Sequence, residues 1–233
     1  MKLLGDQGAR PAVVSDQVGE GAAVRTGVDS RAELTFADLT VTRLGANTVF
    51  SFNAANRTFD LSAGAILLQV PKNSGGAKVT TAATTAAITG TTVMMSTTKF
   101  LVLEGSAQLC SQKYPGECVS VKGGEMVKVG AGGHLGAVAK FNVRLVTETS
   151  PLFTDFPLLS SWGAIAAMFA APPAGPANLG GPGDLIDVVD QKAASSPTPS
   201  PSPSPSPSPS PSPSPSPSPS PSPSPSPSPS PSP

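Results

Sequence analysis

The stretch that decides the fold is RTGVDSRAELTFADLTVTRLG, residues Arg25–Gly45, in which apolar and polar residues alternate between short turns. Within it, AELTF places Ala32, Leu34 and Phe36 on one face and the polar residues between them on the other. A period of two is typical of a β-strand with one buried face. Gly and Asp residues stand where the alternation breaks, and both residue types favour turns. The stretch therefore predicts short strands joined by tight turns.

Strand-like runs and turn residues continue to alternate to about residue 139, with a strand and a turn roughly every eight to twelve residues. This pattern indicates an all-β domain. A sandwich, a barrel and a β-solenoid all fit this pattern. Short strands, glycine-marked corners and few aromatic residues favour a twisted β-solenoid or β-roll. We expect further strands at residues 48–52, 58–62, 65–70, 77–82, 100–104, 107–110, 118–122 and 126–129.

The composition divides the chain into three segments: the β domain (residues 1–140), a linking segment (141–195) and a Ser-Pro tail (196–233). Alternating Ser and Pro offer no apolar face and few N–H donors. We therefore expect the low-complexity tail to be a disordered, polyproline-II-like spacer that reaches on the order of 100 Å.

The linking segment begins with NVRLVTETSPLFTDFPLL, which is compatible with one last strand or a short helix, and ends in a Gly/Pro linker. After it, Trp162, Ile165, Met168 and Phe169 fall at helical spacing. We expect this short amphipathic helix to pack on the β domain rather than to bind a partner.

The charge balance excludes several function classes. Lys and Arg number 15, as do Asp and Glu, so the formal net charge is zero. There is no basic surface for nucleic acid and no polybasic membrane patch. The N-terminus MKLLGDQG lacks the apolar region of a signal peptide, and the longest apolar run, residues 163–171, is too short to span a bilayer. We expect a soluble chain without a transmembrane segment.

The residues that carry chemistry are few. His134, in GAGGHLG, is the only histidine, and a lone histidine among glycines is typical of a solvated loop. No GxSxG motif occurs, and the acidic residues are scattered singly. We therefore predict no catalytic, cofactor-binding or metal-binding residues, and a protein that is not an enzyme.

The two cysteines flank a turn. Cys110 ends one predicted strand and Cys118 begins the next, with Pro115-Gly116 between them. Hairpin arms can bring two such residues close enough for a disulfide. We expect a Cys110–Cys118 disulfide if the protein is exported and free buried thiols if it is cytosolic.

Five motifs follow one another along the chain: GEGAAVRTGVDSRAELTFADLTVTRLGANTVFSF, DLSAGAILLQVPK, AAITGTT, KFLVLEGSAQL and VSVKGGEMVKV. In this order, over roughly residues 5–133, they resemble the domain of the iron-dicitrate regulator FecR. The resemblance implies an extracytoplasmic, twisted, solenoid-like β domain. In iron-responsive regulators this domain meets an outer-membrane receptor and passes a signal through a membrane helix to a sigma factor. Similar domains occur in exported or surface proteins.

The chain departs from the regulator pattern in several ways. The sigma-binding helices and the membrane helix are missing, and we expect a strand ahead of Lys2 that the sequence does not contain. The usual Asp-Gly of one hairpin reads Asp38-Leu39, so we expect this hairpin to turn differently.

The motif series, the lack of recognisable catalytic groups and the Ser-Pro tail favour an exported, non-enzymatic module of the periplasm, cell surface or medium. Such a module would bind another envelope protein or a cell-wall component, without a cofactor, and its tail would act as a spacer. The alternative is the periplasmic sensor part of a transmembrane sigma-factor regulator.

Overall fold

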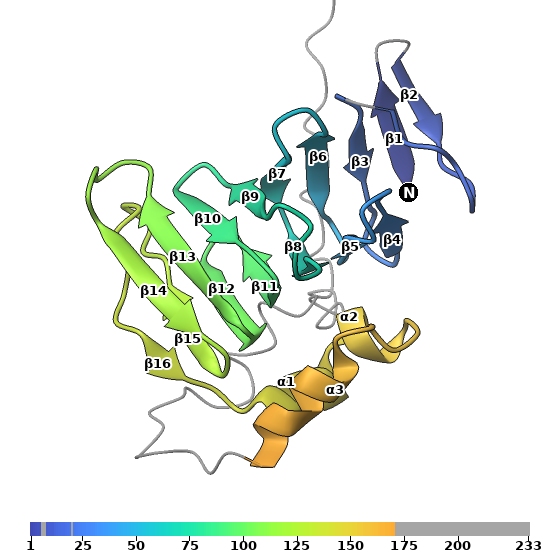
Figure 1. Cartoon of the computed structure of the whole chain (residues 1–233). Helices are drawn as coiled ribbons and strands as arrows, with labels where there is room; N and C mark the ends of the chain where they lie inside the picture. Colours follow the sequence, from blue (N-terminus) through green and yellow to red (C-terminus); the bar gives the residue numbers. More distant parts are fainter. Residues whose placement is uncertain (6–7, 20, 171–233) are drawn as a thin grey trace, which may run out of the picture. The chain divides into compact units, whose positions relative to one another are not determined.

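The computed structural model describes residues 1–5, 8–19 and 21–170. The predicted Ser-Pro tail and the Gly/Pro part of the linking segment lie outside these residues. Within them the chain forms two β-sheets and a layer of short helices (Figure 1).

The two sheets are built by a chain that moves from one to the other after every one or two strands from β4 onward. Neighbouring strands are antiparallel except β7 and β9, which are parallel because the single strand between them, β8, lies in the opposite sheet. The nine-stranded sheet has the order β14 (Cys118–Lys122), β13 (Ser106–Ser111), β10 (Thr84–Ile88), β9 (Ala77–Thr80), β7 (Thr58–Ala63), β6 (Val49–Asn53), β3 (Ala23–Arg25), β1 (Lys2–Gly5) and β2 (Gly8–Pro11). The seven-stranded sheet has the order β16 (Ala139–Lys140), β15 (Glu125–Lys128), β12 (Lys99–Glu104), β11 (Thr92–Ser96), β8 (Ala65–Gln69), β5 (Val41–Leu44) and β4 (Ala32–Thr35).

The main core lies between the sheets. Alternating residues of each strand point inward, as the period-two pattern predicts, and form one cluster of buried apolar side chains. The cluster includes Val24, Phe50, Leu61, Val79, Ile88 and Leu109 from the nine-stranded sheet and Leu44, Ile66, Leu68, Val93, Phe100 and Val102 from the seven-stranded sheet.

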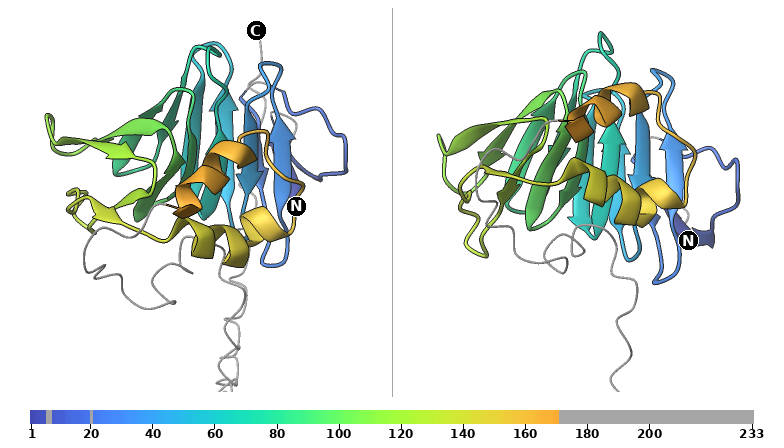
Figure 2. Two further views of the ribbon diagram at one scale, coloured as in Figure 1. Left: turned by 60° about the horizontal axis from the view of Figure 1, so that its bottom comes forward. Right: turned by 90° about the horizontal axis from the view of Figure 1, so that it is seen from below.

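Helices cover the outer face of the seven-stranded sheet (Figure 2). They are α1 (Val143–Thr149), α2 (Pro151–Thr154), α3 (Trp162–Ala167) and a 3₁₀ turn, η1 (Met168–Ala170). A second apolar cluster joins Leu67, Met94, Leu101, Leu103 and Met126 of the sheet to Phe141, Val143, Val146, Leu152, Phe153, Leu159 and Ile165. β8, β11 and β12 are therefore buried on both faces.

Arg43, from the RLG part of the opening stretch, fastens the helical layer to β5. Its Nε donates to Glu33 Oε2 at 2.8 Å, and its guanidinium lies 5.0 Å from the ring centre of Phe156. The same guanidinium donates to the backbone carbonyls of Leu152, at 2.9 Å, and Pro157. The Arg43 side chain is only 2 % exposed. The helical layer is thus held by a buried polar clamp as well as by apolar packing.

An all-β domain was expected, and the described residues are mostly β with a few short helices; all eight of the further strands expected from sequence are present. The sequence pattern did not locate β1, β2, β3, β10, β11 or β16. The segment after residue 141, for which a strand and a helix both remained open, is helical: Asn142 caps α1, and Pro151 occupies the first turn of α2. As predicted, the Trp162–Phe169 face packs on the domain, with Ile165 fully buried.

No helix among the described residues is both long and apolar enough to cross a membrane. The strand expected ahead of Lys2 stays a prediction.

Candidate functional site

An aromatic pocket opens at one end of the core, between the β4–β5 turn and the β6–β7 hairpin, with a volume of about 220 Å³. Three phenylalanines line it. The ring centre of Phe36 lies 5.0 Å from that of Phe52 and 5.2 Å from that of Phe59, both edge to face. Phe52 and Phe59 are buried in the main core, whereas Phe36 is only partly buried. Ala37 and Ala54 complete the apolar part of the lining.

The turn beside the pocket carries an unusual leucine. The Phe36 N–H donates to the Thr40 carbonyl and the Leu39 N–H donates to the Phe36 carbonyl, both at 2.9 Å, so the loop contains three residues. Leu39 closes it with φ +65°, the left-handed position that glycine usually fills in such hairpins. For a leucine this conformation costs about 1–2 kcal/mol. The hairpin therefore keeps the left-handed turn although the sequence offers no glycine.

The Leu39 side chain recovers little of this cost by burial, because Leu39 is 70 % exposed. The other non-glycine residues with positive φ in the described part of the chain are Ser15, Asn47, Arg57 and Asn73, all of them polar. Asparagine tolerates this conformation well. Leu39 is thus an apolar, strained and exposed residue beside an apolar pocket.

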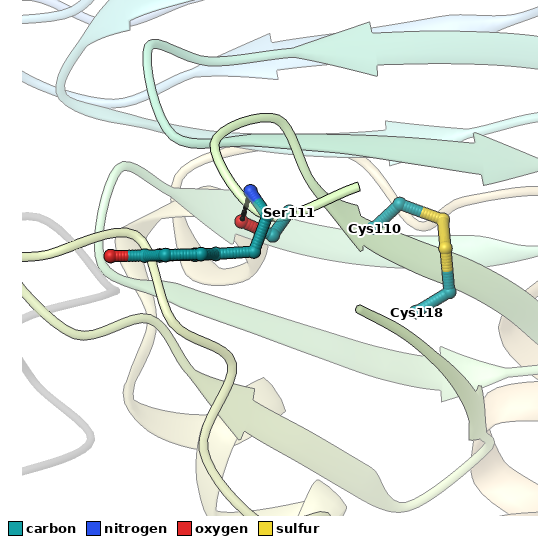
Figure 3. Close-up of a disulfide and its surroundings, with 4 residues drawn as sticks. Cys110, Ser111 and Cys118 are labelled. Carbon is teal, nitrogen blue, oxygen red and sulfur yellow. Dashed lines mark hydrogen bonds between the residues drawn. A yellow bond between two sulfur atoms is a disulfide. The ribbon is translucent and has the colours of Figure 1, made fainter. Parts of the chain in front are cut away.

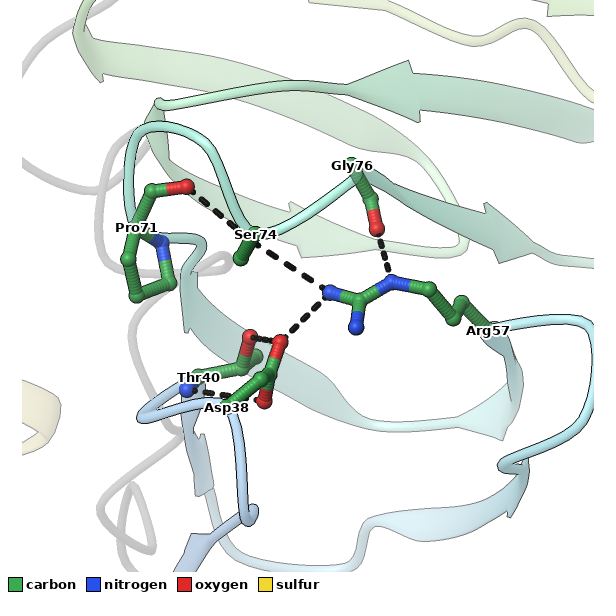
Figure 4. A network of polar contacts seen from close by, with 6 residues as sticks. All are labelled: Asp38, Thr40, Arg57, Pro71, Ser74 and Gly76. Carbon is green, nitrogen blue, oxygen red and sulfur yellow. Dashed lines mark hydrogen bonds and ion pairs between the residues drawn. The ribbon is translucent and has the colours of Figure 1, made fainter.

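A network of polar contacts fixes the rim of the pocket (Figure 4). The Asp38 carboxylate accepts hydrogen bonds from the Thr40 hydroxyl at 2.7 Å, from the Thr40 N–H at 3.1 Å and from Arg57 at 2.5 Å. Arg57 also donates to the Gly76 carbonyl and, at 3.4 Å, to the Ser74 hydroxyl. Three loops that are distant in sequence are thereby tied together around the pocket.

The same contacts set the charge of the rim. Partial burial alone would raise the pKa of Asp38, but the hydrogen bonds from Thr40 and Arg57 outweigh it and hold that pKa below its ordinary value. Asp38 is therefore ionised at neutral pH and neutralises the guanidinium of Arg57. An apolar pocket with a neutralised rim suits an apolar side chain better than an ion.

The two cysteines lie in another part of the molecule, at the edge of the nine-stranded sheet (Figure 3). They face each other across β13 and β14, with Cα atoms 4.1 Å apart, and a disulfide joins them. Cys110 is half-buried and Cys118 is exposed. Next to them, the Ser111 hydroxyl donates to the Gly133 carbonyl at 2.8 Å, which holds the β13–β14 hairpin against the loop that carries His134.

His134 lies on that loop with its side chain 62 % exposed. Its ring stacks on Tyr114, with the ring centres 3.7 Å apart, and its Nδ1 is 3.1 Å from Glu117 Oε2. The Leu135 N–H donates to the other oxygen of Glu117 at 2.6 Å. This N–H has the largest effect and lowers the pKa of Glu117; burial opposes it, and the hydrogen bond and charge of His134 add to the lowering. The contacts join two loops, and among the described residues no three His, Cys, Asp or Glu side chains lie together as a metal-ligand group.

Sequence reasoning missed the aromatic pocket. The period of two places Phe36 on one face with Ala32 and Leu34, but nothing in this spacing shows that the core opens beside it. The one signal was the Asp38-Leu39 pair at a turn where glycine is usual. Its link to Arg57, 19 residues later, had no signal in the sequence.

The fold and this site define a mostly-β domain of two packed sheets with an apolar pocket and an exposed leucine at one end. The profile of the family described as "FecR protein" matches residues 22–108. This part of the chain is therefore a FecR domain, as the motifs indicated. The matched segment contains Leu39 and every residue that lines the pocket.

Two crystal structures of a protein described as "a putative anti-sigma factor from Parabacteroides distasonis ATCC 8503" are similar to this chain. Each is 15 % identical, with TM-scores of 0.48 and 0.47. Each alignment covers 55 % of this chain and 65 % or 64 % of the other, so the chain spans slightly less than two thirds of these proteins. No curated protein matches the sequence.

Proposed function

We propose that this protein is a non-enzymatic binding module of the cell envelope, whose FecR domain contacts another protein through a docking patch formed by Leu39 and the aromatic pocket. The observation that carries the proposal is the position of this patch inside the matched FecR segment. A strained, exposed leucine next to a pocket lined by Phe36, Phe52 and Phe59 is the kind of surface that apolar contacts between proteins use.

An extracytoplasmic location is part of the proposal. The FecR resemblance supports it, as does the disulfide between Cys110 and the exposed Cys118, since disulfides persist in oxidising compartments. In this setting the Ser-Pro tail would act as a spacer between the FecR domain and whatever the chain is attached to.

The twisted β-solenoid or β-roll expected from the sequence is also part of the proposal. The chain enters the nine-stranded sheet at β1 and the seven-stranded sheet at β4, and then advances one or two strands at a time to β14 and β16, which supports a roll-like description of the two sheets.

The alternative function is the sensor part of a transmembrane sigma-factor regulator, which the FecR domain supports equally. The two functions differ in one observable property. A regulator would be joined to a membrane helix in its native form, whereas an exported module would be released by removal of a leader.

Photo-crosslinking in the native host tests the docking patch. A photoreactive phenylalanine analogue at Ala54, which is exposed and lines the pocket, should form a covalent product with a protein. The matched control is the same analogue at Ala87, which is exposed on β10 of the nine-stranded sheet. A product at Ala54 that is lost in Leu39→Asn supports the proposal. Equal products from both positions, or none from Ala54, would refute it.

A further inference from the structure

The docking patch carries both a projection and a pocket on the same surface. Leu39 follows directly after Ala37 and Asp38, which line the pocket, and its side chain is 70 % exposed. The pocket volume of about 220 Å³ equals roughly seven water molecules at about 30 Å³ each. This is room enough for the four carbon atoms of a leucine side chain.

A surface with these two features is self-complementary under a two-fold rotation. When two copies face each other, the Leu39 side chain of each can enter the pocket of the other, so that both projections and both pockets are used. A different partner that supplied one apolar side chain would fill the pocket and leave Leu39 in water. The second copy is the occupant that accounts for both features.

The electrostatics of the patch do not oppose this occupant. Asp38 and Arg57 neutralise each other on the rim, with their carboxylate and guanidinium 2.5 Å apart, and the formal net charge of the chain is zero. Two copies therefore meet without repulsion of like charges, either at the patch or over the whole chain.

The backbone at Leu39 adds an independent argument. Glycine or asparagine would hold φ +65° with less strain, and neither would present an apolar side chain to solvent. A strained residue at a surface position is a sign that its side chain has a use that the isolated domain does not show.

We propose that the docking patch binds a second copy of this chain, in a two-fold dimer in which Leu39 of each copy occupies the aromatic pocket of the other. This inference rests on the proposed function, because it names the protein that the patch contacts.

Sedimentation of the full chain over a concentration series tests the dimer. The wild type should show a monomer–dimer equilibrium. Leu39→Asn, which keeps a residue that tolerates the turn, should raise the dissociation constant at least about tenfold. Ala54→Trp, which blocks the pocket from its exposed rim, should do the same. Leu158→Asn removes a leucine that is 71 % exposed elsewhere on the molecule and should leave the constant within about twofold of the wild type.

Isotope-filtered nuclear Overhauser spectra give the direct contact. In a mixture of copies with labelled leucine methyl groups and copies with labelled phenylalanine rings, cross-peaks should join Leu39 to Phe36 and Phe52 across the two copies. A wild type that stays monomeric up to millimolar concentration would overturn the inference, and so would a dimer that survives both Leu39→Asn and Ala54→Trp. If the purified chain is monomeric while Ala54 crosslinks to a different protein in cells, the second-copy inference fails and the proposed binding function stands.

Discussion

Replacing Arg43 with alanine is expected to destabilise the whole domain, because Arg43 clamps the helical layer to the seven-stranded sheet. The substitution removes the donors of the Leu152 and Pro157 carbonyls and leaves a space beneath Phe156. It also breaks the ion pair with Glu33, whose side chain is 31 % exposed, so that solvent screens this part of the loss.

The size of the effect follows from these losses. The buried Leu152 carbonyl, left without its donor, costs about 1–3 kcal/mol, and the cavity left by a fully buried side chain as large as Arg43 adds about 2 kcal/mol or more, whereas Pro157 is exposed and contributes little. We therefore expect Arg43→Ala to lower the free energy of unfolding by about 3–5 kcal/mol. That is a large fraction of the roughly 5–15 kcal/mol that stabilises an ordinary domain.

Urea denaturation of the full chain, followed by Trp162 fluorescence, measures this loss. Trp162 is a suitable reporter because it packs in the outer cluster, beside Phe153 and Phe169. The matched control is Arg144→Ala, which removes an exposed ion pair with Glu148 one helical turn away and should leave the urea midpoint almost unchanged, because solvent screens this pair. If Arg43→Ala costs no more than Arg144→Ala, the clamp does not stabilise the domain and the reasoning is wrong.

Three further predictions concern the disulfide, the pocket rim and the fold. Replacing both Cys110 and Cys118 with serine should lower the free energy of unfolding by about 2–3 kcal/mol. This is the entropy that the disulfide removes from the unfolded chain by closing a loop with a sequence separation of 8. Equal urea midpoints for this variant and the wild type would contradict the prediction. Because the folded pKa of Asp38 lies below its ordinary value of 3.8, its ionised form stabilises the fold above that pH, and the contribution is lost as the pH falls through the folded pKa. Stability measured from pH 7 to pH 2 should therefore fall less steeply below pH 3.8 in Asp38→Asn than in the wild type, and identical slopes would exclude this role. Gly64→Ala should lower the free energy of unfolding by at least about 2 kcal/mol in the same urea assay. Gly64 has φ +80°, and an added Cβ would lie 2.5 Å from the Cα of Thr48. An unchanged free energy of unfolding would mean that the junction between β7 and β8 has room for a side chain.

Sequence reasoning located most of the strands because burial on one face leaves a period of two. It worked best where a strand has one solvent face, as in β6 and β7, and where a turn residue marks each end. It also located β8 and β12, whose continuous apolar runs are short enough for strands. The sequence does not show which sheet has an outer face covered by helices. The outward-facing Leu67 and Leu101 are as apolar as the inward-facing Ile66 and Val102, so the two faces cannot be told apart.

The candidate site was less predictable because it depends on contacts between distant hairpins. The sequence did mark Leu39 as a departure from the usual turn. It did not show that the turn would keep its left-handed residue, nor that Arg57 and Ser74 would reach the same corner from two other loops. Such contacts follow from the register of the sheets, which a single sequence does not specify.

We propose that this chain, with its FecR domain, works outside the cytoplasm. The most direct test is to fractionate the native host and to read the intact mass and the N-terminus of the protein by mass spectrometry, with free thiols alkylated at lysis. The account predicts the protein in the envelope or medium, with a processed N-terminus and with Cys110 and Cys118 protected from alkylation by their disulfide. A cytosolic protein with an unprocessed N-terminus, alkylated at both cysteines, would contradict it.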